Sequence, residues 1–231
     1  MFGLDEWIAG ISDEGSILVV VLVATLLGLR HATDPDHLAA VSTLVVSGRE
    51  RATRAAARLG AAWGLGHAVT LVAFGVPILL AERYLPELVQ RGAETTVAAL
   101  IAFLAARLLV RWRHGAFATT PLGQDEHVHR VRTPAGAFGI GLVHGMGGSA
   151  GVGVLLLAAV PSQTLALVAL VVLALFTAVS MTLVTTGFGA VLSVRRVTGA
   201  LATAAPALAL SSLAFGVWYA AAAWSLAPYP F

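Results

Sequence analysis

Residues 30–38 read Arg30-His31-Ala32-Thr33-Asp34-Pro35-Asp36-His37-Leu38, and they interrupt an apolar segment that extends from about residue 16 to residue 47. An ionised side chain at the centre of a lipid-embedded helix costs about 2.5 to 3.5 kcal/mol. Such groups are therefore expected to face a sheltered interior or to bind something. The apolar segment is also too long for one straight span, and Pro35 cannot donate a helical hydrogen bond. The stretch predicts a broken first helix that carries a polar site.

The composition of the whole chain indicates a lipid environment. Of its 231 residues, 58% are hydrophobic and 11% are charged, whereas soluble domains carry roughly 25% charged residues. A typical soluble enzyme is thereby excluded. Cysteine is absent, which excludes disulfide scaffolds, cysteine-ligated zinc, iron–sulfur clusters and thiol catalysis. The expected fold class is an all-α integral membrane protein.

Six stretches of the chain are long and apolar enough to cross a bilayer, which takes about 20 residues of helix. They cover 16–47, 57–81, 95–112, 135–160, 163–190 and 198–225. We expect residues 1–231 to form a single transmembrane domain, a six-span helical bundle. Its first three-helix half would be 1–112, its cytoplasmic loop 113–134, and its second three-helix half 135–231.

The distribution of arginine predicts the orientation in the membrane, because cytoplasmic loops retain positive charge. Ten arginines fall on one side of the predicted spans and two on the other. The ten are Arg49, Arg51, Arg54, Arg58, Arg111, Arg113, Arg130, Arg132, Arg195 and Arg196, and the two are Arg83 and Arg91. Six crossings then leave both termini outside. We expect a multi-pass protein of a bacterial cytoplasmic (inner) membrane.

The two halves of the chain share a faint similarity. The sequence 28–31 (Gly-Leu-Arg-His) recurs as 141–144 (Gly-Leu-Val-His), an offset of 113 (144 − 31). The sequence 67–70 (His-Ala-Val-Thr) has an echo in 177–180 (Thr-Ala-Val-Ser), an offset of 110 (177 − 67). Since each half has an odd number of spans, the second would enter the membrane inverted. Inverted repeats with interrupted helices are typical of transporters, whereas chance similarity in an alanine-rich chain is the alternative.

The polar stretch of the first segment has the ligands of a transition-metal site. His31, Asp34, Asp36 and His37 offer two imidazoles and two carboxylates, which suit Ni²⁺, Co²⁺, Zn²⁺ or Mn²⁺. On a regular helix Asp36 would point about 140° away from His31. A break at Pro35 would allow Asp36 to turn inward. Arg30 is permanently protonated and cannot be a ligand, so we expect it to be an internal counter-ion to Asp34.

Two more histidines lie near the middle of predicted spans. His67 follows Gly64-Leu65-Gly66, and His144 lies in Gly141-Leu142-Val143-His144-Gly145. Glycines permit close approach of helices, which would let both rings join the first cluster. The alternative for each is a structural histidine that only forms hydrogen bonds. The predicted metal ligands are therefore His31, Asp34, Asp36, His37, His67 and His144.

The stretch 30–38 resembles the signature of the nickel/cobalt transporter (NiCoT, NicO-type) family. The H-x4-D-H core of that signature maps onto His31, Asp36 and His37, and Leu65-Gly66-His67 resembles the family's second, Leu-Gly-His motif. The resemblance implies a proton-motive-force-dependent permease for Ni²⁺ or Co²⁺, in which the H-x4-D-H residues recognise the metal. It covers the first two spans well and the remainder loosely.

The rest of the chain departs from the nickel and cobalt importers. Their later motifs carry intramembrane acidic residues and they usually have eight spans, whereas the fourth segment here reads Gly145-Met146-Gly147-Gly148-Ser149 after His144. The arrangement is closer to a compact branch with UreH-like proteins. By analogy, His144, Met146 and Ser149 would be the contribution of the second half.

The expected function is secondary transport of a divalent transition-metal cation bound near the midplane. The predicted partners are the lipid bilayer, the metal ion and protons as coupling ion, with homo-oligomer formation left open. We expect no nucleic acid, no prosthetic group and no enzyme activity. Walker A and H-E-x-x-H sequences are absent.

Two other functions compete with metal transport. Gly147-Gly148-Ser149-Ala150-Gly151 fits G-x-S-x-G, and a rhomboid-like intramembrane serine protease would use Ser149 as nucleophile. Such an enzyme needs a histidine base from the sixth span, and 198–225 contains no histidine. The second alternative is an exporter of another small ion that uses Arg30 as clamp. The neighbouring carboxylates favour a cation.

Overall fold

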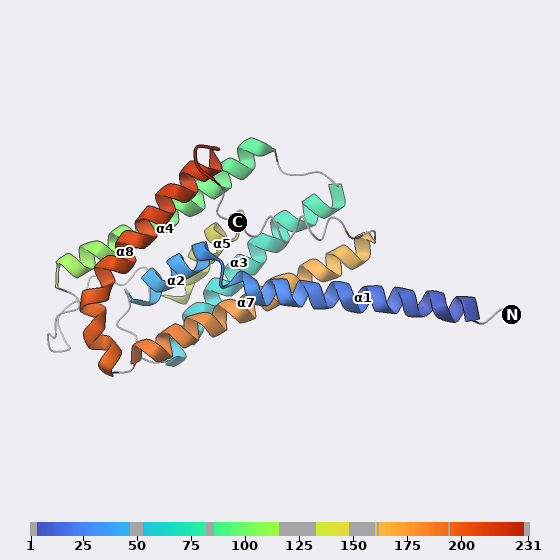
Figure 1. The fold of residues 1–231 in the computed structure, drawn as a ribbon, viewed down its shortest axis with the longest axis horizontal. Helices are drawn as coiled ribbons and strands as arrows, with labels where there is room; N and C mark the ends of the chain where they lie inside the picture. Colours follow the sequence, from blue (N-terminus) through green and yellow to red (C-terminus); the bar gives the residue numbers. More distant parts are fainter. Residues whose placement is uncertain are drawn as a thin grey trace.

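The computed structural model describes residues 4–46, 53–81, 86–115, 133–147, 160, 162–193 and 195–228, and all regular structure within these ranges is α-helical (Figure 1). The prediction of an all-α protein is confirmed. The helices are α1 (Leu4–His31), α2 (Pro35–Val46), α3 (Thr53–Ala81), α4 (Glu87–Arg113), α5 (Pro134–His144), α7 (Gln163–Ser193) and α8 (Arg195–Ala223).

The first predicted span is broken where the sequence indicated. Helix α1 ends at His31 and α2 begins at Pro35, with a bend of 43° between them. Pro35 takes the first position of α2, where the missing N–H costs nothing because that N–H would have no intrahelical partner. The Asp34 carbonyl accepts the first helical hydrogen bond, from Leu38 N. The break turns Asp36 into the interior, where it is fully buried.

Four helices of the described chain are long and apolar enough to cross a membrane, and the bent pair α1–α2 makes a fifth crossing if it counts as one span. These five agree with five of the six predicted segments. The fourth predicted segment, 135–160, begins with α5, but most of its second part lies outside the described residues. The described chain thus supports a multi-span bundle with four or five crossings.

The third predicted segment was placed too late in the sequence. It was expected to begin at residue 95, whereas α4 begins at Glu87. Glu94 lies in the second turn of α4 and is 2% exposed. The Gln90 side chain donates a hydrogen bond to its carboxylate. Because its carboxylate is hydrogen-bonded, Glu94 can be buried within a helix. The apolar residues alone do not predict that the helix begins this early.

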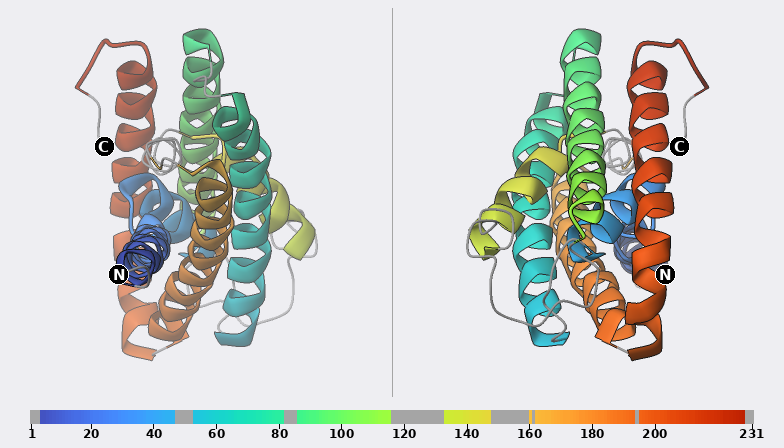
Figure 2. Two further views of the ribbon diagram at one scale, coloured as in Figure 1. Left: turned by 90° about the vertical axis from the view of Figure 1, so that its right-hand side faces the viewer. Right: turned by 90° about the vertical axis from the view of Figure 1, so that its left-hand side faces the viewer.

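The helices pack as two central pairs, and one further helix packs against each member of the first pair. Helix α3 packs against α7, and α4 packs against α8. The end of α1 lies on α7, and α5 lies on α3, while α2 contacts α4, α7 and α8 (Figures 1 and 2). The start of α3, the end of α7 and the start of α8 lie at one end of the bundle (Figure 2). The break between α1 and α2 is consequently enclosed by several helices.

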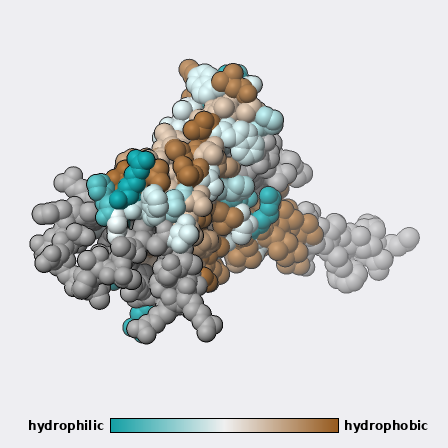
Figure 3. Space-filling view, turned by 60° about the vertical axis from the view of Figure 1, so that its left-hand side comes forward, coloured by the Kyte–Doolittle hydropathy of each residue, from teal (hydrophilic) through white to brown (hydrophobic). Residues whose placement is uncertain are grey.

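The outside of the bundle is rich in large apolar side chains. Leu65, Val69, Phe103, Val171 and Leu183 are each more than half exposed. Brown apolar side chains cover much of the described surface in Figure 3, and hydrophilic residues gather in a few places. Monomeric soluble proteins rarely expose continuous apolar patches of this kind. The surface fits a bundle that is embedded in lipid.

Helices α1 and α5 dock on α7 and α3 through matching contacts. A hydroxyl of α3, Thr70 Oγ1, donates to Leu142 O near the end of α5 at 2.9 Å. A hydroxyl of α7, Ser180 Oγ, donates to Leu29 O near the end of α1 at 2.5 Å. Thr70 and Ser180 are 110 residues apart, and Leu29 and Leu142 are 113 apart (180 − 70 and 142 − 29). These are the two offsets of the sequence similarity.

Glycines make this docking close. A Cβ at Gly141 of α5 would overlap Trp63 O and lie 2.9 Å from His67 N of α3. A Cβ at Gly28 of α1 would lie 2.7 Å from Leu173 O and 3.0 Å from Thr177 N of α7. Distances below 3.0 Å leave no room for a side chain. Both α1 and α5 therefore need a glycine one turn before the final histidine.

Candidate metal centre

Six predicted ligands come together where the broken helix meets α3 and α5. His31 is the last residue of α1, Asp34 lies in the break, and Asp36 and His37 lie in the first turn of α2. His67 is in the middle of α3 and His144 is the last residue of α5. All six are buried, and none is more than 8% exposed: His31, Asp34, Asp36, His37, His67 and His144.

His31 is held on both of its ring nitrogens. Its Nδ1 lies 3.1 Å from an Asp34 carboxylate oxygen, and its Nε2 lies 3.0 Å from Nε2 of His67. A carboxylate on the far nitrogen of a metal-binding histidine fixes the ring orientation and raises its basicity. The contacts therefore suit His31 as a ligand through Nε2. Asp34 is placed to orient this ring.

Asp36 is placed between two imidazoles. One of its oxygens lies 3.1 Å from His37 Nδ1, and the other lies 3.3 Å from His144 Nε2. The Asp36 side chain is completely buried. A buried carboxylate at these distances partly compensates positive charge placed among the rings.

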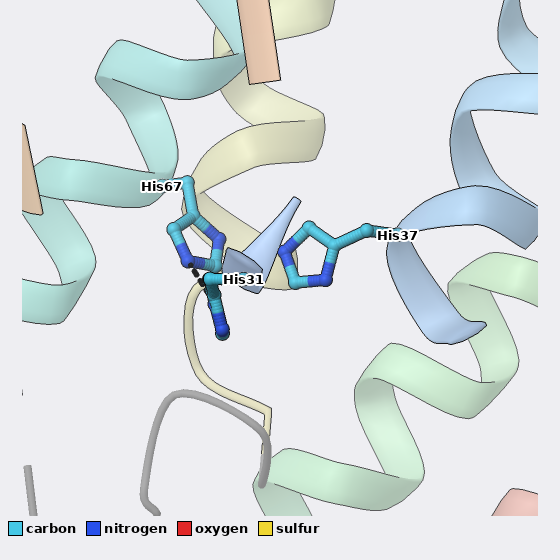
Figure 4. Close-up of side chains that lie close together, drawn as sticks. All are labelled: His31, His37 and His67. Atoms are coloured by element: carbon cyan, nitrogen blue, oxygen red, sulfur yellow. Dashed lines mark hydrogen bonds between the residues drawn. The ribbon is translucent and has the colours of Figure 1, made fainter. Parts of the chain in front are cut away.

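The rings of the cluster also contact one another. The centroids of His31 and His37 are 4.5 Å apart, and those of His37 and His144 are also 4.5 Å apart. The side chains of His31, His37 and His67 converge from three helices, and one ring nitrogen of His37 is turned toward the other two rings (Figure 4). Since Nδ1 of His37 contacts Asp36, this nitrogen is Nε2.

Two groups of three residues have spacing suitable for a metal ion. One consists of His31, His37 and His67, and the other of Asp36, His37 and His144. In each group the three ligand atoms lie within 4.8 Å of one another. Within the described part of the chain, His37 Nε2, His67 Nδ1 and His144 Nδ1 have no hydrogen-bond partner. Buried polar atoms without partners are uncommon and indicate a place for a ligand.

One residue beside the cluster was missed by sequence reasoning. The Trp63 ring is 5.8 Å from that of His37 and 5.7 Å from that of His144, and it is 1% exposed. It lies on α3, four residues before His67, and therefore on the same helix face. That spacing was the available signal. Trp63 packs against one side of the cluster, and its buried Nε1 has no hydrogen-bond partner among the described residues.

Arg30 differs from its prediction in one respect. It does approach Asp34, with 3.6 Å between Nη2 and Oδ1. Its side chain is nevertheless 74% exposed, so it is not an internal counter-ion. At the C-terminal end of α1 the side chain leaves the bundle, while its neighbour His31 points inward. Ser149 of the alternative protease lies outside the described residues, and Met146 is partly buried near the end of α5.

Comparison with known proteins agrees with the chemistry of this centre. The sequence pattern described as NicO, high-affinity nickel-transport protein, matches residues 17–132. This is half of the chain, and it includes five of the six clustered residues. The chain belongs to the NicO family. The predicted family resemblance is confirmed, and the description of the family as a transport protein agrees with the expected function.

A curated relative extends the similarity beyond the NicO pattern. The chain is 30% identical over 146 residues to a protein named "Urease accessory protein UreH" from Bacillus sp. (strain TB-90). The alignment covers 60% of this chain and 62% of that protein, so the chain spans less than two thirds of the relative's length. No solved structure gives a significant match.

Proposed function

We propose that this protein is a secondary transporter that moves Ni²⁺ or Co²⁺ across a bacterial cytoplasmic membrane. The observation that carries the proposal is the single buried cluster of four imidazoles and two carboxylates inside an apolar bundle. Burying ionisable groups in a membrane is costly, and they persist there where they have a function. Nitrogen and carboxylate ligands without thiolates suit these borderline divalent ions.

The ligand set follows from the contacts. His31, Asp36 and His37 form the H-x4-D-H core, and His67 and His144 are the further ligands in this proposal. Asp34 orients His31 through Nδ1, at 3.1 Å. Both nickel and cobalt accept such ligands, so the donor set favours neither, and nickel is preferred because the NicO description names it.

The two halves, 1–112 and 135–231, act as inverted repeats in this proposal. The matched hydrogen bonds of Thr70 and Ser180 support it, because both occur at the offsets of the sequence similarity. The matched contacts of Gly28 and Gly141 support it as well. In such transporters one half rocks against the other around a site near the midplane. In this proposal the segment 135–160, which begins with α5, supplies the remaining span of the second half.

Orientation and coupling follow from charge. Ten arginines on one side place that side in the cytoplasm and both termini outside. Histidine must be neutral to bind a metal, so protons and metal compete for the same nitrogens. That competition couples inward metal movement to protons without ATP. The name of the UreH relative suggests that the imported nickel supplies a urease.

Flux measurements test the proposal. Purified protein in proteoliposomes with an imposed pH gradient is expected to carry ⁶³Ni²⁺ and ⁵⁷Co²⁺, and His37→Ala is expected to lower both fluxes at least about 100-fold, since His37 belongs to both groups of three ligands. His114→Ala is the matched control, because His114 is exposed at the end of α4. Absence of flux in the parent protein, or equal flux in His37→Ala, would contradict metal transport.

A further inference from the structure

The candidate ligand atoms fall into two groups of three, one with His31, His37 and His67 and one with Asp36, His37 and His144. His37 belongs to both groups, and its ring centroid lies 4.5 Å from those of His31 and His144. We propose that the centre contains two successive metal positions that share His37, and that the transported ion passes from one to the other. The inference rests on the proposed metal transport and specifies how the ion moves within the site.

The first position is formed by three imidazoles, those of His31, His37 and His67. The two Nε2 atoms of His31 and His67 are 3.0 Å apart. With metal–nitrogen bonds of about 2.1 Å, two neighbouring ligands of one ion are roughly 3.0 to 3.4 Å apart. His37 turns Nε2 toward the same point (Figure 4). These three ligands thus need only small movements to hold an ion.

The second position is formed by Asp36, His37 and His144. Asp36 Oδ1 is 3.1 Å from His37 Nδ1, and its Oδ2 is 3.3 Å from His144 Nε2. These separations also match neighbouring ligands of one ion. The second position differs chemically from the first, because a carboxylate replaces one imidazole. It compensates more of the positive charge of a divalent ion.

The two ring nitrogens of His37 face different positions. Nε2 faces His31 and His67, while Nδ1 faces Asp36. An ion that leaves one nitrogen can therefore be taken up at the other after a small rotation of the ring or of α2. Two divalent ions on one imidazole ring would repel each other strongly in a weakly polarisable interior. The positions are consequently occupied one at a time.

The helices that carry His31 and His144 indicate which side of the membrane each metal position serves. His31 ends α1 and His144 ends α5, and the ends of these two helices make equivalent paired contacts in the bundle. Each of these histidines belongs to one position only. Rocking of the halves would bring α1 or α5 closer to His37 in turn. The first position then serves the side from which α1 enters, and the second serves the side from which α5 enters.

The test compares His31→Ala, His144→Ala and His37→Ala in the full-length protein in detergent, with Ni²⁺ as the probe. Binding stoichiometry and the nickel X-ray absorption spectrum are measured, and ⁶³Ni²⁺ flux is measured in proteoliposomes. We expect His31→Ala and His144→Ala each to retain one bound ion, held by two imidazoles and a carboxylate or by three imidazoles respectively. Both should lose flux at least about 10-fold.

His37→Ala and the double variant His31→Ala/His144→Ala are expected to lose binding at least about 100-fold, because each damages both positions. The corresponding phenylalanine variants preserve packing against Trp63, and they replace any alanine variant that is not monodisperse. His114→Ala is the control. If either single variant loses binding as completely as His37→Ala, or keeps parental flux, the two-position proposal is wrong. If the parent protein binds no Ni²⁺, the transport proposal itself fails.

Discussion

The ends of α1 and α5 have the same setting but different chemistry. Each of these helices ends in a histidine, His31 or His144, and docks on α7 or α3 through a glycine one turn earlier and a matching hydrogen bond from a hydroxyl group. After His31 the chain continues with two carboxylates and another histidine, whereas after His144 it continues with Gly145-Met146-Gly147-Gly148. The contacts that dock α1 and α5 are therefore alike in the two halves, whereas most of the candidate metal ligands come from the first half.

The largest expected effect concerns the docking geometry. Gly141→Ala would place a Cβ against Trp63 O, and Gly28→Ala would place one 2.7 Å from Leu173 O. Overpacking costs about 1 to 3 kcal/mol, and a clash with backbone leaves little room for relief. Both variants should lower the midpoint of thermal unfolding, measured by size-exclusion chromatography after heating, and Gly141→Ala should lower it more.

Gly139→Ala is the matched control for this experiment. Gly139 lies on the same helix as Gly141, and no described atom lies within 4 Å of the place that a Cβ would take. Alanine is favoured over glycine in a helix by about 1 kcal/mol, so the midpoint should stay constant or rise. A fall as large as that of Gly141→Ala would mean that helix docking is not the cause.

The second expected effect concerns the ligands that only the first half carries. Asp36→Asn should lower ⁶³Ni²⁺ flux at least about 100-fold, because Asp36 contacts both His37 and His144. Asp34→Asn should lower it about 10-fold, as is typical for a residue that orients a ligand. At the offset of 113 the second half has Gly147 in place of Asp34 (147 − 34), so no carboxylate there can compensate.

Glu87→Gln is the control for removal of a carboxylate. Glu87 pairs with Arg91 on the surface of α4, and its side chain is 77% exposed. The Glu87→Gln variant should show the same ⁶³Ni²⁺ flux as the parent protein. Equal loss in Asp34→Asn and Asp36→Asn would mean that both carboxylates bind the ion directly, which would revise the role assigned to Asp34.

Much of this centre could be predicted from sequence because its signals are local. Four ionisable residues around Pro35 in an apolar segment predict both the break and the ligands. Glycines near His67 and His144 predict close helix approach. The two offsets, 113 and 110, were also visible in the sequence, and they match the hydroxyl bonds of Thr70 and Ser180.

Other features depend on side-chain directions that sequence does not determine. The difference between Asp34 and Asp36 arises from how the chain turns between α1 and α2, which places one carboxylate behind His31 and the other between two rings. The exposure of Arg30 has the same origin. The early start of α4 could not be predicted because burial of Glu94 depends on its neighbours, including Gln90.

The smallest expected effect tests whether the two docking contacts are energetically alike. Thr70→Val removes the hydroxyl donor to Leu142 O of α5, and Ser180→Ala removes the hydroxyl donor to Leu29 O of α1. Hydrogen bonds between membrane helices contribute about 0.6 kcal/mol on average and at most about 1.7. The two variants should therefore lower the midpoint of thermal unfolding by similar small amounts, and Thr96→Val should not, because Thr96 is exposed and bonds only within its own helix. If only one of the two interhelical variants is destabilised, the two hydrogen bonds differ in strength. The ends of α1 and α5 would then be equivalent in sequence and position, but their docking contacts would not stabilise the protein equally.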